Sequence, residues 1–243
     1  MKKYLLSAAL IVLLSALTSE TLLSQTAQDI LEKMINAQGG REALEKIKDT
    51  TTQATIEMMQ MGMTGTLTMY QKEPNKLRMD TEMMGMIMTQ AFDGQTAWMD
   101  SPQTGVQIMS EKLGAEFKQQ ALGNDSLLHP EKYGITYQYR GEVKEDNRDC
   151  HVLEVSYQEG RKVTMLLDAS TYLPYKMKTT SLNQAGMEAD IENILSEYKK
   201  VGEIMVPFSI LVKQEGMEAV RITLIEVEYN KGLEDSLFEM PEK

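Results

Sequence analysis

Most of the chain after Asp49 alternates apolar and polar residues, and this period of two constrains the fold more than any other feature. The clearest segment is Lys76–Met84, in which one side of an extended chain carries Leu77, Met79, Thr81 and Met83. Its other side carries Arg78, Asp80 and Glu82. Similar segments recur as far as Ala219–Tyr229, and turn residues such as Asp93-Gly94 separate them. This pattern is typical of half-buried β-strands joined by tight turns.

Short links between these segments predict antiparallel neighbours that pair in chain order. The alternation slips in Met86–Phe92 and in Ala219–Tyr229, which indicates a β-bulge. A sheet of about 11–12 strands cannot stay flat and must curl, close or fold over something. One face of every strand is apolar, so we expect the curled sheet to have an apolar inside.

Two stretches have helical periodicity instead. Thr26–Ala37 and Arg41–Lys48 flank Gly39 and Gly40, which end the first helix. Ser110–Leu128 is a helical insertion interrupted at Gly123-Asn124. The predicted fold is mainly β: one curled antiparallel sheet, an incomplete, half-open barrel, wrapped around the N-terminal helix and the helical insertion.

The N-terminus has the pattern of a secretory signal peptide. Lys2 and Lys3 precede an apolar run from Tyr4 to Leu17, which is short for a membrane span. We expect a signal peptide over residues 1–24, cleaved near Ser24, and one exported domain over residues 25–243. An uncleaved anchor is the alternative.

The net charge and the cysteine content limit the binding partners and the disulfide bonds that we expect. The chain has 243 residues and a net charge of -11, which opposes binding to a nucleic-acid backbone. Cys150 is the only cysteine, so no internal disulfide is expected. We expect its thiol to be buried and inert; pairing with another chain is the alternative.

Methionine is unusually abundant. Eleven of 20 methionines fall between residues 58 and 99. Their flexible side chains adapt to irregular contents, which predicts a wall that accommodates changing guests. An ordinary core that uses methionine in place of leucine is the alternative. Thioether binding of Cu(I) is another, because Met59, Met61 and Met63 are predicted on the face opposite Met58.

No catalytic constellation stands out. His129 and His151 are the only histidines, and no nucleophile-elbow, zinc, calcium or phosphate-loop motif is present. Cys150 and His151 should point to opposite faces of a strand, with His151 in a turn or at a sheet edge. We therefore predict a protein without enzymatic activity, cofactor or metal. A glycosidase needs only two carboxylates, so a hydrolase acting on envelope polymers stays open as an alternative.

Several stretches together resemble the outer-membrane lipoprotein-sorting, LolA-like carriers of Gram-negative bacteria. In chain order they are Gly39–Leu44, Tyr70–Arg78, Phe92–Trp98, Leu167-Asp168, Thr171–Lys176, Val206-Pro207 and Asp235–Pro241. The resemblance implies a half-open barrel around helices, with an apolar cavity that carries acyl chains across the periplasm. Arg78 matches the strand arginine of that family. The insertion at Ser110–Leu128 and the methionine-rich segments depart from it.

The expected function is a periplasmic carrier that binds acyl chains of lipids or lipoproteins for transfer to the outer membrane, with only transient membrane contact. A non-enzymatic sensor module that holds an envelope protein partner on the same sheet is the alternative. The side chains predicted to line the cavity are Leu67, Met69, Leu77, Met79, Met83, Leu153, Val155, Val163, Met165, Phe208, Ile210 and Ile222.

Overall fold

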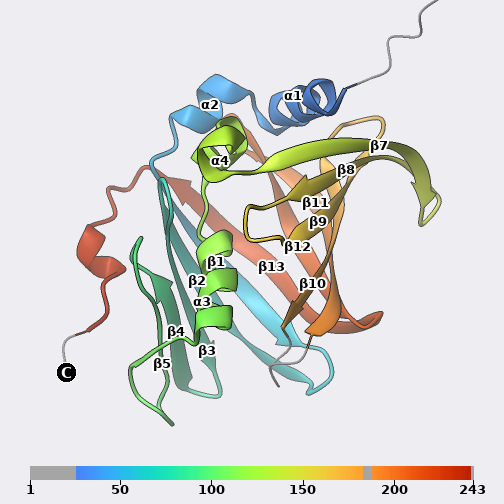
Figure 1. The fold of residues 1–243 in the computed structure, drawn as a ribbon. Coiled ribbons are helices and arrows are strands. Elements are labelled where there is room, and N and C mark those ends of the chain that lie inside the picture. Colours follow the sequence, from blue (N-terminus) through green and yellow to red (C-terminus); the bar gives the residue numbers. More distant parts are fainter. Residues whose placement is uncertain (1–25, 183–187, 242–243) are drawn as a thin grey trace, which may run out of the picture.

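The computed structural model describes residues 26–182 and 188–241. The predicted signal peptide, residues 1–24, lies outside the described residues. Figure 1 shows one strongly curved sheet that surrounds helix α3 (Glu111–Gln120) on one side. The described part is mainly β, as predicted, and its sheet has 13 strands, slightly more than the expected number.

The strands form two antiparallel meanders. The first consists of β1 (Asp49–Met58), β2 (Met63–Lys72), β3 (Lys76–Met83), β4 (Met86–Phe92), β5 (Ala97–Asp100) and β6 (Gln107–Ile108). The second consists of β7 (Thr136–Glu145), β8 (Arg148–Ser156), β9 (Lys162–Asp168), β10 (Pro174–Leu182), β11 (Glu188–Val201), β12 (Ile204–Gln214) and β13 (Met217–Tyr229).

The two meanders join at a seam that local patterns do not predict. Strands pair in chain order within each meander, as expected, but β1 pairs with β13, from Thr50 opposite Tyr229 to Met58 opposite Val220. The consecutive strands β6 and β7 become the two outer edges of the sheet. The sheet is therefore a half-open barrel whose centre is built from the first and the last strand.

The predicted bulge lies in β13. Gln53 pairs with Glu226 and Ala54 pairs with Leu224, so Ile225 is the extra residue on β13. Its side chain is exposed. Strand β4 pairs with β3 without a register shift, so the second suspected slip, in Met86–Phe92, is not a bulge there.

Helices α1 (Ala27–Gln38) and α2 (Arg41–Glu45) cover one end of the barrel (Figure 1). Thr26 and Asp29 form a reciprocal capping box that fixes the start of α1. The buried face of α1 packs against Leu153, Leu167 and Ile204 of the sheet. This face consists of Ile30, Leu31, Met34 and Ile35, and it lies within the predicted helix Thr26–Ala37.

The predicted insertion is two helices, α3 and α4 (Asn124–Leu128), followed by a 3-10 turn, η1 (Pro130–Tyr133). They separate at the predicted interruption, Gly123-Asn124. The chain ends in a segment that contains a second 3-10 turn, η2 (Asp235–Leu237). This segment is anchored by Asp49, whose buried carboxylate accepts hydrogen bonds from the backbone N–H groups of Lys231, Gly232 and Leu233.

Candidate functional site

The face of the sheet that the helices cover carries four rows of side chains, which we call the inner wall. Residues directly opposite each other in an antiparallel pair share a face, so the register of the strands defines each row. The first row is Leu195, Ile210, Ile222, Ile56, Gly65 and Met83, from β11 to β3. The second is Leu153, Met165, Met177, Asn193, Val212, Val220, Met58 and Met63, from β8 to β2.

Two further rows complete the inner wall toward the helical end. They are Leu224, Ala54, Leu67, Thr81 and Met88, and then Val227, Thr52, Met69, Met79, Gln90 and Met99. None of the four rows contains a charged residue. These four rows thus form an apolar surface with a few neutral polar groups, and the ammonium of Lys199 lies over the ring of the neighbouring Phe208 on the same face.

The middle of the inner wall is only half-buried. Ile56, Met69, Met79, Ile210 and Ile222 pack against a buried cluster that contains Leu67 and Phe208, yet each keeps part of its surface exposed. Exposed apolar surface gains free energy when an apolar guest removes it from water. This surface can therefore bind an alkyl chain through apolar contacts alone.

Helix α3 lies across the inner wall and is attached to one flank by apolar contacts. Phe117 and Ala121 are buried in a cluster with Leu77, Phe92 and Met109 from the β3–β6 side. The half-buried Met79 packs against the same cluster and also against the cluster beneath the middle of the wall. The helix therefore covers part of the methionine-bearing strands.

The opposite flank holds α3 by polar contacts. Ser181 Oγ on β10 donates to the Glu116 carboxylate over 2.7 Å. Arg161 donates to Gln119 Oε1 over 3.0 Å, and Gln119 Nε2 donates to Glu159 over 3.1 Å. At the start of the helix, Lys112 pairs with Glu188 at 3.3 Å. The helix thus bridges two flanks that are far apart in the sheet.

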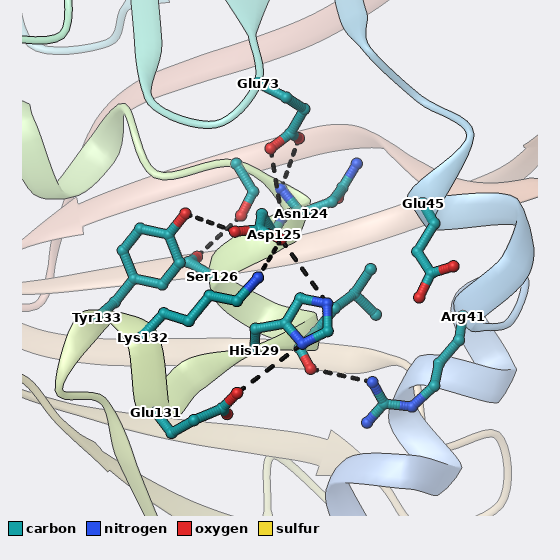
Figure 2. A network of polar contacts seen from close by, with 12 residues as sticks. Arg41, Glu45, Glu73, Asn124, Asp125, Ser126, His129, Glu131, Lys132 and Tyr133 are labelled. Atoms are coloured by element: carbon teal, nitrogen blue, oxygen red, sulfur yellow. Dashed lines mark hydrogen bonds and ion pairs between the residues drawn. The ribbon is translucent and has the colours of Figure 1, made fainter.

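A polar network fixes the junction after α3 (Figure 2). The Glu73 carboxylate, from the β2–β3 turn, accepts hydrogen bonds from the backbone N–H groups of Asn124 (2.7 Å) and Asp125 (3.3 Å). Burial raises the pKa of Glu73, although these hydrogen bonds oppose the shift. Asp125 in turn accepts from the Tyr133 hydroxyl over 2.7 Å, so α4 is tied to both the sheet and η1.

Arg41 secures the same end of the barrel. Its guanidinium pairs with Glu32 of α1 and donates to the Leu128 carbonyl of α4 over 3.0 Å. A cleft of about 430 Å³ lies beside this junction, lined by residues that include Leu44, Ile47 and Glu73. None of the twelve predicted cavity residues lines it.

The structure brings eleven of the twelve predicted cavity residues into the apolar clusters of the helix-covered face. Leu67, Phe208, Met69, Met79, Ile210 and Ile222 belong to the central cluster, and Leu77 belongs to the α3 cluster. Leu153 lies under α1, while Val155 and Val163 pack near Leu122 and Met165 touches both groups. Met83 lies apart, beside Met86, Met88 and Pro102 near the end of the sheet. Whether these residues line an acyl-chain site stays a prediction.

Sequence reasoning missed several wall residues, including Ile56, Met177, Leu195 and Val212. Ile56, Leu195 and Val212 lie in strands that the alternation identified, so extending the period along each strand would have found them. The contacts of Ser181 and Glu188 could not be predicted from alternation, because their partners lie on α3, which is distant in sequence.

The proposed split of the methionine motif is wrong. Met58 and Met63 are directly opposite each other at the ends of β1 and β2 and share a face, because residues 59–62 form the turn between the strands. Alternation cannot be continued through a turn. The described residues contain no group of three or more His, Cys, Asp or Glu side chains arranged to hold a metal.

Arg78 lies on the other face of the sheet from Leu77 and Met79. It donates to the Leu237 carbonyl over 3.0 Å and pairs with Asp80. The nearby Trp98 indole donates to the Phe238 carbonyl over 2.8 Å. In this structure Arg78 therefore fastens the C-terminal segment to the outside of the sheet.

The two neighbours Cys150 and His151 face opposite ways, as predicted. Cys150 is a free, fully buried thiol packed with Val152 and Leu166. The prediction for His151 is wrong, since it lies within β8, one strand inside the edge, and is buried. Its ring stacks on Tyr172, and its Nδ1 lies 3.0 Å from the Tyr139 hydroxyl.

Comparison with solved structures shows which fold this geometry belongs to. A LolA superfamily protein from Nitrosomonas europaea matches with a TM-score of 0.62 at 15% identity, over 89% of this chain and 98% of that protein. The chain has the LolA-like fold. A DUF1329 family protein from Desulfovibrio piger shares it, with a TM-score of 0.59 at 15% identity over 88% of this chain and 97% of its own.

A further LolA-like match is an outer-membrane lipoprotein-sorting protein domain from Vibrio parahaemolyticus. Its TM-score is 0.57 at 15% identity, over 87% of this chain and 97% of that one. No protein-family model matches the sequence, and no curated protein matches it significantly. The three structural matches confirm the resemblance to LolA-like proteins at the level of the fold. Within the described residues, no helix has the length and apolar character needed to cross a bilayer.

Proposed function

We propose that the protein is a periplasmic carrier that binds the acyl chains of lipids or lipoproteins against the inner wall and delivers them to the outer membrane. The observation that carries this proposal is the band of half-buried apolar side chains across the middle of the sheet, with no charged residue in its four rows. The LolA-like fold, shared with a lipoprotein-sorting domain, supports the same assignment.

Methionine suits reversible binding of a flexible guest. Its unbranched side chain has several rotatable bonds and a polarizable sulfur, so it repacks around different chain lengths. Burial of one methylene group contributes about 0.8 kcal/mol, so a chain of about 16 carbons offers on the order of 10 kcal/mol before ordering costs. A carrier needs an affinity of this size to compete with a membrane and still release its cargo.

The first experiment asks what the purified protein holds. Protein exported in its native host is extracted with organic solvent, and the extract is analysed by mass spectrometry. We expect acyl lipids or lipoprotein-derived chains in near-stoichiometric amounts. An extract empty of acyl species, together with no uptake of added fatty acid, contradicts the proposal and favours a module that binds a protein partner.

Two test variants and one control test the location of the site. Met79→Glu and Met83→Glu each place a charge on the inner wall and should abolish uptake of a fluorescent fatty acid. Met205→Glu is the control, because Met205 alternates with the inward-facing Ile204 and Val206 and is half-buried on the opposite face. Circular dichroism and thermal unfolding establish that each variant is folded. Uptake that persists in folded Met79→Glu protein places the site elsewhere.

A further inference from the structure

Three hairpin connections of the first meander lie at one end of the sheet, the lower end in Figure 1. They are the segments 58–63, 83–88 and 101–106, and we call them together the methionine rim. None contains a charged residue, although the chain carries a net charge of -11. The three tips are therefore uncharged, and the acidic residues nearest to them, Glu57, Glu82 and Asp100, lie in the adjoining strands.

The methionine rim projects into solvent with large apolar side chains. Met61 is 60% exposed, Met84 is 78% exposed and Ile87 is 56% exposed. Gly62, Gly85 and Gly105 occupy the turns with positive φ, and a Cβ added at any of them meets no atom within 4 Å. Exposed large apolar side chains concentrated at two neighbouring tips are typical of a surface that contacts an apolar partner.

Charge distinguishes the methionine rim from the second meander at the same end. The β12–β13 turn there has an equally exposed methionine, Met217, but Glu215 and Glu218 flank it. Carboxylates resist transfer into a bilayer interface and are repelled by anionic headgroups, whereas neutral apolar tips enter it without that cost. The charge pattern therefore favours a lipid surface as the partner of the first meander alone.

The methionine rim is continuous with the inner wall. Met83 and Met88 belong to two rows of the wall, and they also line an apolar groove of about 160 Å³ with Met86 and Pro102. An alkyl chain that leaves a bilayer at this point stays against apolar surface along its route to the wall. A flat protein partner would not require this continuity.

We propose that the methionine rim inserts into the interfacial layer of a lipid bilayer, and that acyl chains pass across it between the bilayer and the inner wall. The second half of this inference rests on the proposed carrier function, whereas the first half does not. The two are therefore measured separately, as vesicle binding and as uptake of monomeric fatty acid.

The test uses the protein purified after export, together with vesicles of phosphatidylcholine that contain or lack an anionic lipid. Flotation measures vesicle binding, and transfer of a fluorescent fatty acid from the vesicles measures exchange. The test variant is Met61→Gln combined with Met84→Gln. The control is Met217→Gln, because Met217 is 61% exposed at the same end of the sheet and differs from Met61 mainly in its charged neighbours.

We expect wild type and Met217→Gln to float with neutral vesicles. The double variant should lose flotation and exchange by about tenfold or more, the scale expected for removing two apolar side chains from a bilayer interface. Its uptake of monomeric fatty acid should be unchanged. Met79→Glu should still float while taking up no fatty acid; uptake by that variant places the fatty-acid site elsewhere and does not count against docking.

Three results overturn the docking proposal: wild type that does not float, a double variant that floats as well as wild type, or flotation that requires anionic lipid. Size-exclusion chromatography supplies a further one. If the wild type is a dimer that the double variant dissociates, without vesicle binding, the methionine rim is an interface between copies of this chain.

Discussion

Ser181 Oγ donates a 2.7 Å hydrogen bond to the carboxylate of Glu116, and this bond joins β10 to helix α3 across the inner wall. The other flank of α3 is held by the buried Phe117 and Ala121. Individual polar contacts contribute about 1 kcal/mol each, whereas burial of a phenylalanine contributes several times more. The helix should therefore open from its polar flank while its apolar flank stays attached.

Weakening the polar flank should speed access to the wall. Ser181→Ala combined with Arg161→Ala removes the donors to Glu116 and Gln119. We expect uptake of a fluorescent fatty acid to accelerate by about 30-fold, the effect of roughly 2 kcal/mol on an opening equilibrium. Hydrogen exchange of the α3 amides should rise in parallel. Unchanged exchange and unchanged uptake together would show that α3 does not control entry.

Weakening the apolar flank should instead cost stability. Phe117 is only 4% exposed, so Phe117→Ala leaves a cavity and should destabilise the protein by about 3 kcal/mol or more. Leu113→Ala, on the same helix but half-buried, should cost less. Urea unfolding measures both. Equal losses for the two variants would mean that the α3 cluster does not depend on Phe117.

Alternation predicted the sheet well where burial is one-sided. The segment Met86–Phe92 has the predicted bounds, and Lys76–Met83 ends within one residue of the prediction. Lys76–Met83 has a polar face and an apolar face, so its composition reports its geometry directly, whereas the alternation slips in Met86–Phe92 and the turn residues Asp93-Gly94 mark its end. Pairing of β1 with β13 left no such local signal, because it depends on contacts between the two ends of the domain.

Glu73 gives the junction of α3 and α4 a pH dependence. Its pKa is raised above the ordinary 4.5, so the folded state binds this proton more strongly than the unfolded state. The stabilising contribution of the proton is complete below 4.5 and is lost as the pH rises through the raised value. Glu73→Gln keeps an acceptor and should remove this slope from a plot of Tm against pH.

A second variant separates the charge of Glu73 from its hydrogen bonds. Glu73→Ala leaves the N–H groups of Asn124 and Asp125 without this acceptor and should lower Tm at every pH. An unaltered slope in Glu73→Gln would assign the pH dependence to another group.

His151 should act in the opposite direction and at higher pH. Burial lowers its pKa below 6.5, against the opposing carboxylate of Glu142 and with the help of Lys33. The imidazole is neutral in the folded protein, so its contribution is present above 6.5 and is lost as the pH falls further. His151→Phe should flatten Tm between pH 7 and 5. A wild-type Tm that is flat over this range would refute the assignment.

Arg78, which matches a strand arginine of the LolA-like family, holds the C-terminal segment in this structure. Since it contacts the Leu237 carbonyl on the outer face, Arg78→Ala should leave fatty-acid uptake unchanged and increase hydrogen exchange around Phe238. Trp98→Phe removes the donor to the Phe238 carbonyl and should cost about 1–3 kcal/mol, because that carbonyl is left without this buried donor. Loss of uptake in folded Arg78→Ala protein would contradict this assignment.

The site was less predictable than the fold. The alternation of apolar and polar residues predicts the face on which Leu67 and Ile222 lie, but the position of α3 decides which part of that face stays half-exposed. The position of α3 depends in turn on Lys112, Gln119 and Glu116, whose partners lie 40 to 76 residues away. Met58 and Met63 show the same limit at short range, since the turn between them decides their faces.

The seam between β1 and β13 has a consequence for how the domain is made. Thr50 cannot pair with Tyr229 until nearly all of the residues between β1 and the end of β13 have been synthesised. Contacts of such long sequence separation slow folding. The strands at the centre of the sheet are thus the last to acquire both neighbours. The growing chain therefore has no completed sheet, and the apolar inner wall forms only after β13 has been synthesised.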